Sequence, residues 1–181
     1  MAHTAAGKLQ GMTGDAVWYE AAQVVGITNA LNVAADTLGV LGPVDETAAP
    51  PEVRKLFAEV RDFYRSGDVP LGFRFIAHDV AYASDVWAAT RHAFADHRLP
   101  RRLKEALAFA VSMTTRSASG TALHLSQMRR FGVSPQGVME IVGVTQMFSS
   151  YTKIADTLQL EPDMGDIAPV DTTPAPGGPM S

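Results

Sequence analysis

The chain has 181 residues, of which 46% are hydrophobic and 19% charged, so it can bury one sizeable core. Its formal net charge is −4 and no basic stripe stands out, which argues against a protein that binds the phosphate backbone of nucleic acids. It contains no cysteine, which excludes disulfides, thiolate metal sites and any thiol redox cycle run by this chain alone.

The chain starts with the residues MAHTAAGKLQ, which lack the charged and then apolar pattern of a secretory signal. No apolar run reaches the length of about eighteen residues that a membrane span needs. We therefore expect a cytoplasmic protein without a membrane segment.

Helical patterns follow in chain order, separated by proline-rich and glycine-rich punctuation. Apolar residues recur at helical spacing over residues 15–40. The polar, proline-rich segment 43–51 is typical of an extended linker. A short amphipathic helix is expected from Glu52, and the stretch after Pro70 is again helical, with a break at Asp79 that can cap a second segment.

Two apolar helical stretches in the second half are separated by the polar turn SASGT. The first begins at Pro100 and carries Glu105, although a helix that must otherwise be buried is an expensive place for a carboxylate without a partner. The second begins near Ser117 or Ser119, which are both suitable N-cap residues, and carries His124 on or beside its apolar stripe.

A last long helix is predicted from Ser134 and Pro135 to Leu158, because a cap residue followed by proline is a common helix start. No segment shows the alternation typical of strands, so the predicted fold class is all-α. Residues 161–181 are rich in Pro, Gly, Asp and Thr and are expected to be disordered.

An internal repeat relates the two ends of the helical region. The sequence Ala-Asp-Thr-Leu occurs at residues 35–38 and again at 155–158, and Glu20 and Glu140 share the same offset. The repeat predicts four parts, which are a partial first repeat at 1–42, a linker at 43–51, a main repeat at 52–160 and a tail at 161–181.

One residue of slippage extends the repeat upstream and aligns His3 with His124. The first copy therefore lacks a counterpart of the helix that carries Glu105, because it starts just after that position. One hypothesis is that Met1 is an internal methionine of a longer reading frame. The other is that a second subunit completes the first half.

The pattern of Glu105, eleven residues, Ser117-Ala-Ser-Gly120, three residues and His124 resembles the signature of the alkylhydroperoxidase D-like and carboxymuconolactone decarboxylase superfamily. The peroxidase branch has a Cys-x-x-Cys pair where this chain has Ser117 and Gly120. The resemblance covers most of residues 1–162. It implies an all-α helical bundle of the alkylhydroperoxidase D-like type with a partial internal repeat, and a homo-oligomer that is a trimer or a hexamer.

Glu105 and His124 are the candidate catalytic residues, since a buried carboxylate can hold and polarise an imidazole that transfers protons near neutral pH. The alternative is a structural contact that joins two helices. Ser117, Gly120 and Thr121 are candidate substrate-binding residues. Ser117 lies seven residues before His124, so it is a helix cap rather than a nucleophile, and Gly120 either opens a small pocket or lets two helices pack closely.

The remaining polar and large side chains predict no further site. His92 and His97 are five residues apart on diverging helix faces, so we predict no metal and no cofactor. Trp18 and the methionines, including Met139 and Met147, fit core packing at helical spacing.

Three functions remain open from the sequence. The favoured one is a carboxymuconolactone decarboxylase-like protein with cofactor-independent acid/base chemistry on a small organic substrate, cyclic or carboxylated. The second is an alkylhydroperoxidase or peroxiredoxin-like antioxidant protein whose redox cysteines are lost or lie upstream of Met1. The third is a non-catalytic oligomeric helical scaffold.

Overall fold

The computed structural model describes residues 15–159, and this part of the chain is helical without any strand. The all-α prediction is therefore confirmed. The predictions for His3, Met1 and the tail at 161–181 lie outside the described residues. The elements are α2 Asp15–Thr37, the 3₁₀ helix η1 Leu38–Leu41, α3 Pro51–Tyr64, α4 Leu71–Ile76, α5 Val80–Phe94, α6 Arg101–Thr114, α7 Ala118–Arg130 and α8 Pro135–Leu158.

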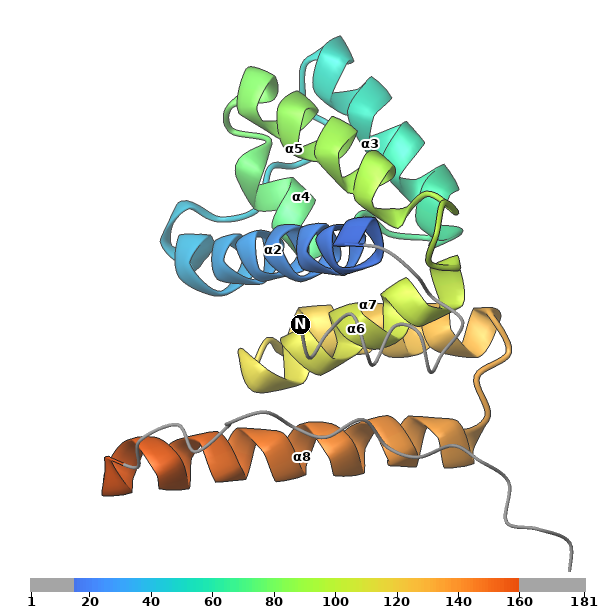
Figure 1. Ribbon diagram of the computed structural model, residues 1–181. Coiled ribbons are helices and arrows are strands. Elements are labelled where there is room, and N and C mark those ends of the chain that lie inside the picture. The colour runs from blue at the N-terminus through green and yellow to red at the C-terminus, as the bar shows by residue number, and fades with distance from the viewer. Residues whose placement is uncertain (1–14, 160–181) are drawn as a thin grey trace, which may run out of the picture.

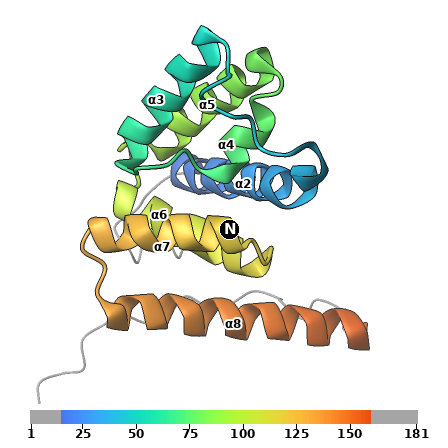
Figure 2. The ribbon, with the colours of Figure 1, turned by 180° about the vertical axis from the view of Figure 1, so that it is seen from behind.

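The helices form stacked tiers (Figure 1). The helices α3, α4 and α5 lie at one end, α2 crosses beneath them, α6 and α7 form the next tier, and α8 lies outermost. The view from behind shows the same order (Figure 2). Because α2 contacts α4 and α5 on one side and α6 and α7 on the other, it is the central helix of the bundle.

Side-chain caps start several helices at the predicted residues. Asp79 accepts a hydrogen bond from the Tyr82 amide at 3.0 Å, and Ser134 accepts one from the Gly137 amide at 3.1 Å. Pro100 is the residue before α6 rather than its first residue, because its backbone is extended with ψ at 148°. The helix therefore begins one residue later than predicted.

Most of the apolar core lies between α2 and the tier of α3, α4 and α5. Phe63 and Phe73 each place their ring edge-on to Trp87, at centroid distances of 5.2 and 5.6 Å. The prediction that Trp18 and the methionines pack in the core was wrong for some of these residues. Trp18 is 39% exposed, and Met139 and Met147 are more than half exposed, since helical spacing does not tell which face of a helix finds a partner.

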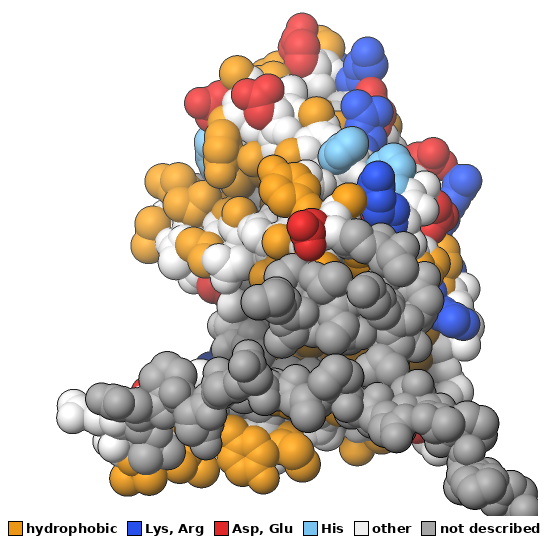
Figure 3. Space-filling view, viewed as in Figure 1, with side chains coloured by type: hydrophobic (Ala, Val, Ile, Leu, Met, Phe, Trp, Pro, Cys, Tyr) orange, Lys and Arg blue, Asp and Glu red, His pale blue; other side chains and the backbone are white. Residues whose placement is uncertain are grey.

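Helix α8 keeps no residue buried, although much of its surface is apolar. Hydrophobic side chains gather along the lower edge of the molecule, where α8 lies (Figure 3). The exposed large apolar residues of this helix, here called the α8 apolar face, are Met139, Val144, Met147, Phe148, Tyr151, Ile154 and Leu158.

The segment Asp15–Leu41 is long and apolar enough to cross a membrane by length and composition, contrary to the sequence expectation. Its buried face nevertheless carries Glu20, Thr28 and Asn32, which face neighbouring helices. These polar side chains and the contacts on both sides are those of a helix packed inside a bundle.

Candidate active site

Glu105 is fully buried on α6 and has a partner for each carboxylate oxygen. Its Oε2 lies 2.7 Å from Nδ1 of His124, and its Oε1 lies 2.5 Å from Nε of Arg101. The cost of burying a carboxylate is thus offset by a cation and an imidazole. The structure therefore brings the two predicted catalytic residues into direct contact.

Arg101 stands four residues before Glu105 on the same helix, which is the spacing that lets side chains meet. Its guanidinium lies over the ring of Phe63 at 4.1 Å and over that of Phe94 at 4.9 Å from the centroid. These cation–π contacts hold the guanidinium in place. Arg101 compensates the charge of Glu105 and leaves the other carboxylate oxygen for His124.

His124 projects from α7 and is 5% exposed. Its ring lies parallel to that of Phe94, with an interplanar angle of 4° and a centroid distance of 5.9 Å. Because Nδ1 faces the carboxylate, we assign the proton of the neutral ring to Nδ1. Within residues 15–159 no hydrogen bond reaches Nε2, so this nitrogen is free to accept a proton.

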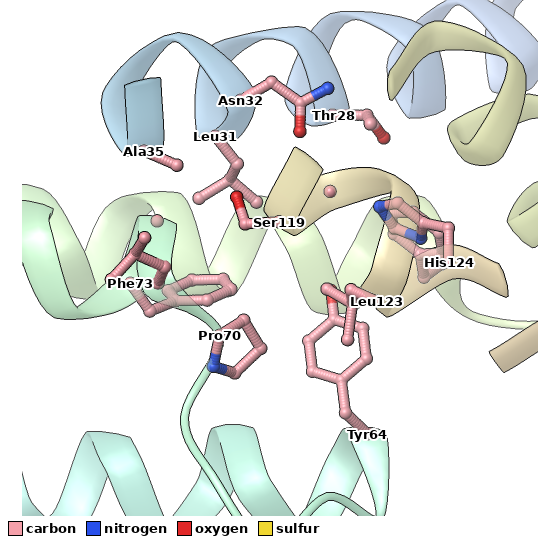
Figure 4. A pocket seen from close by; sticks show the side chains of 14 residues that line it. Thr28, Leu31, Asn32, Ala35, Tyr64, Pro70, Phe73, Ser119, Leu123 and His124 are labelled. Atoms are coloured by element: carbon pink, nitrogen blue, oxygen red, sulfur yellow. The ribbon is translucent and has the colours of Figure 1, made fainter. Parts of the chain in front are cut away.

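A cavity of about 60 Å³ adjoins His124, which is room for a few water molecules. Figure 4 shows His124, Thr28 and Tyr64 toward one side of it, and Phe73 and Pro70 toward the other. The remaining lining residues come from α2, α4, α5 and α7, and they are Leu31, Asn32, Ala35, Leu71, Gly72, Phe94, Ser119, Gly120 and Leu123.

Thr28 and Tyr64 each bring a hydroxyl-bearing side chain to this cavity. The Thr28 hydroxyl is buried and makes no hydrogen bond within the described residues. The Tyr64 side chain is also buried. Burial, reinforced by the negative charge of Glu105, raises the pKa of Tyr64 well above its ordinary value, so the phenol keeps its proton.

Gly120 lies against Asn32 of α2. A Cβ atom at Gly120 would stand 2.2 Å from Oδ1 of Asn32 and 2.7 Å from Oγ of Ser112. The Asn32 amide is fixed because it donates to Ser112 Oγ at 3.1 Å and to Thr115 Oγ1 at 3.0 Å. Gly120 therefore permits close packing of α2 on α7, and it also lines the cavity beside His124.

The other predicted binding residues lie elsewhere. Ser117 is the N-cap of α7, where its hydroxyl accepts from the Gly120 amide and donates to Asp36 Oδ1, both at 3.3 Å. Neither Ser117 nor Thr121 lines the cavity, whereas Ser119 does.

Sequence reasoning missed Arg101, Thr28, Asn32 and Tyr64 as members of the site. The spacing of Arg101 from Glu105 was a usable signal. Thr28 and Asn32 were a second signal, because they are polar residues one helical turn apart in an apolar helix. Nothing in the sequence distinguished Tyr64 from an ordinary core aromatic.

A second buried charge pair ties α2 to α6. Lys104, which is fully buried, contacts the carboxylate of Glu20 and donates to the carbonyl of Ala95. Glu20 also accepts from the backbone amides of Arg98 and Leu99, at 3.0 and 3.3 Å. Burial alone raises the pKa of Glu20, but the contacts with Lys104 and the two amides together outweigh it and lower this pKa.

His92 and His97 lie together, with ring centroids 5.3 Å apart, although the sequence predicted diverging faces. The helix α5 ends at Phe94, so His97 belongs to the following turn and returns toward the helix. No group of three or more metal-ligating side chains occurs in the part of the chain that the structure describes.

Comparison with known proteins agrees with this architecture. Residues 81–160 match the carboxymuconolactone decarboxylase family, and no curated protein matches the chain. The fold is similar to the crystal structure of the alkylhydroperoxidase AhpD core from Rhodospirillum rubrum, with a TM-score of 0.59 and 21% sequence identity over 66% of this chain and 90% of that one. The matched region and the similar fold both agree with the resemblance to the alkylhydroperoxidase D-like and carboxymuconolactone decarboxylase superfamily that the sequence indicated.

Proposed function

We propose that this protein is a cofactor-independent acid/base catalyst, similar to the decarboxylase branch of the superfamily that it resembles, that acts on a small organic substrate. The observation that carries the proposal is the 2.7 Å contact between Glu105 and the Nδ1 atom of His124, with the ring of His124 lining a cavity. A carboxylate behind an imidazole beside a cavity is the arrangement that general acid/base catalysis uses.

Each residue of the group has a distinct role. His124 takes a proton from the substrate with Nε2 and returns it at a later step. Glu105 fixes the tautomer and the orientation of the ring, and it stabilises the imidazolium that forms. Arg101 is a positioning residue, since its ion pair with Glu105 holds the carboxylate in place.

A cysteine peroxidase is the less favoured function, even though the solved relative is called an alkylhydroperoxidase. Peroxide reduction through thiols needs a thiolate, and this chain has no cysteine. The Asn32 amide also occupies the space beside Gly120 that a cysteine side chain would need.

We further infer that the protein is a cytoplasmic homo-oligomer, a trimer or hexamer as the resemblance to this superfamily implies. The α8 apolar face supports self-association, because monomeric proteins seldom expose a contiguous apolar surface of this kind. The same face favours a helical scaffold as the second candidate function, in which Glu105 and His124 only join two helices.

The test of the proposed function is turnover by a substrate panel. Small ketones are followed for α-hydrogen exchange in deuterated water, and small 3-oxo acids for loss of carbon dioxide. We expect His124→Gln to lower the rate on any active compound by about 10²- to 10⁴-fold, the usual contribution of a general base. Glu140→Gln, a substitution on the exposed surface of α8, is the control.

Two results would contradict the proposal. Turnover that His124→Gln leaves unchanged would remove the role assigned to His124. A wild-type protein that is inert toward the whole panel, and whose variants are folded, would favour the scaffold.

A further inference from the structure

We propose that the hydroxyls of Thr28 and Tyr64 bind the oxygen atom of a neutral carbonyl substrate while His124 acts on the carbon next to it. This inference rests on the proposed acid/base function of His124. It assigns a substrate class and two binding residues to the cavity.

The first observation is the unused hydroxyl of Thr28. Other buried hydroxyl residues in these helices donate to the carbonyl four residues earlier, as Thr90 does to Val86 at 2.8 Å and Ser112 does to Ala108 at 2.9 Å. Thr28 is equally buried, yet its hydroxyl makes no hydrogen bond within the described residues. An unpartnered buried hydroxyl costs free energy, so a ligand that pairs with it gains affinity.

The second observation is the Tyr64 hydroxyl at the same cavity. The side chain extends from the end of α3 toward the His124 side of the cavity (Figure 4). Because its pKa is raised by burial and by Glu105, the phenol remains a hydrogen-bond donor. Two hydrogen-bond donors from different helices, α2 and α3, thus line the same cavity.

The charge of the lining selects a neutral group. Within residues 15–159, no lysine or arginine lines the cavity. The guanidinium of Arg101 is paired with Glu105 through Nε, and the ammonium of Lys104 is paired with Glu20. A carboxylate at this depth would therefore be desolvated without a countercharge, whereas a ketone or aldehyde oxygen needs only the two hydroxyls.

The volume limits which part of the substrate enters. A cavity of roughly 150 Å³ holds benzene, so the 60 Å³ here takes a carbonyl group and its neighbouring carbon. Pro70, Leu71, Ser119 and Leu123 are only partly buried and form the solvent side of the cavity. The rest of the substrate extends past these residues.

The chemical step balances without a co-reactant. His124 Nε2 takes a proton from the α-carbon, and the C–H electron pair forms the carbon–carbon double bond of an enolate. The carbonyl oxygen takes the negative charge and is stabilised by hydrogen bonds from Tyr64 and Thr28. The imidazolium then returns a proton to carbon. The net result is exchange of the α-hydrogen with solvent, or its transfer to another carbon of the substrate.

The experiment uses butanone as the neutral probe and propanoate as the charged probe of similar shape. Binding is measured by amide shifts in NMR titrations, and α-hydrogen exchange of butanone is measured in parallel. The variants are Thr28→Val and Tyr64→Phe, which remove only the hydroxyls. The controls Thr152→Val and Tyr151→Phe make the same changes on the exposed surface of α8.

We expect butanone, and not propanoate, to shift amides around the cavity. Each hydroxyl deletion should weaken butanone binding about two- to tenfold, the usual effect of one hydrogen bond, while the controls leave it unchanged. Thr28→Val should also leave the melting temperature unchanged or raise it, because it removes an unpartnered buried hydroxyl. A purely structural role of Thr28 would instead lower it.

The outcomes separate this inference from the proposed function. Binding that depends on the two hydroxyls, without exchange in any variant, would support the inference while the acid/base function fails. Exchange that depends on His124 but not on Thr28 or Tyr64 would overturn the inference and leave the function. Tighter binding of propanoate, or no binding of butanone at any concentration that leaves the protein folded, would also overturn it.

Discussion

Helices α2 and α8 are related by the internal repeat, yet α2 packs against helices on two sides while α8 has no buried residue. The sequence Ala-Asp-Thr-Leu ends α8 and also runs from the end of α2 into the first residue of η1, and Glu20 occupies in α2 the position that Glu140 occupies in α8. Glu20 is buried against Lys104, whereas Glu140 is exposed and accepts a hydrogen bond from Gln136 at 3.4 Å. The two related sequences thus both form a helix, but the neighbouring helices determine whether a given side chain is buried or exposed.

Helices α2 and α8 also differ in the residues that they present at equivalent positions. The buried face of α2 supplies Thr28 and Asn32 to the cavity. At the position of Thr28, helix α8 carries Phe148, which is 66% exposed. We therefore interpret α2 as part of the site and α8 as a surface for association with another subunit.

The largest expected difference concerns the charge pair. Glu20→Ala leaves the fully buried Lys104 without its carboxylate, which should lower the free energy of unfolding by about 3–5 kcal/mol. Glu140→Ala, the matched change on α8, should alter it by no more than about 0.5 kcal/mol. Chemical denaturation measures both, and equal losses would show that the two helices are held in the same way.

The next prediction concerns self-association. Phe148→Asp places a charge in the centre of the α8 apolar face and should lower the mass in solution, measured by light scattering. Tyr19→Asp on α2, at a side chain that is 70% exposed, should leave the mass unchanged. A wild-type protein that is monomeric would refute the role assigned to α8.

A smaller loss of stability should follow from adding a methyl group at Gly120, where α2 and α7 pack closely together. Gly120→Ala should lower the free energy of unfolding by about 1–3 kcal/mol, because the new methyl group meets Asn32. Asn32→Ala in the same chain should recover part of this loss. Gly143→Ala on α8, where a Cβ meets nothing within 4 Å, should instead raise the stability by up to about 1 kcal/mol through helix propensity.

The smallest predicted difference is in the pH dependence of stability. The pKa of Glu20 is lowered in the folded chain, so its contribution is present above its ordinary value of 4.5 and is lost as the pH falls through the lowered one. Glu20→Gln should reduce the loss of stability that the protein shows as the pH falls, and Glu140→Gln should not. The measurement is the denaturant midpoint from neutral to acidic pH for the wild type and both variants. The same pH dependence in the wild type and in Glu20→Gln would contradict the role assigned to Glu20.

The fold was predictable because local signals were consistent. Caps at Asp79, Ser117 and Ser134 start helices where the sequence places them. The contact of Glu105 with His124 was also predictable from the spacing of the superfamily signature. In contrast, the orientation of α8 was not, because its apolar spacing is the same whether the face packs within the chain or against a second subunit.

The cavity was beyond sequence reasoning because residues from five helices, together with Pro70 in the turn before α4, surround it. Thr28 and Tyr64 lie 36 residues apart in the sequence, and only the folded chain places both at one cavity. The role of Gly120 was open for the same reason, since it depends on Asn32 of α2.

The central claim is that Glu105 holds His124 so that a proton-free Nε2 atom faces the cavity. The most direct measurement is a long-range ¹H–¹⁵N NMR spectrum of the His124 ring at neutral pH, assigned with the His124→Gln variant. The account predicts a protonated Nδ1, an unprotonated Nε2 and a change at Nε2 when butanone is added. A proton on Nε2 with a bare Nδ1, or a ring that does not respond to any small carbonyl compound, would contradict it.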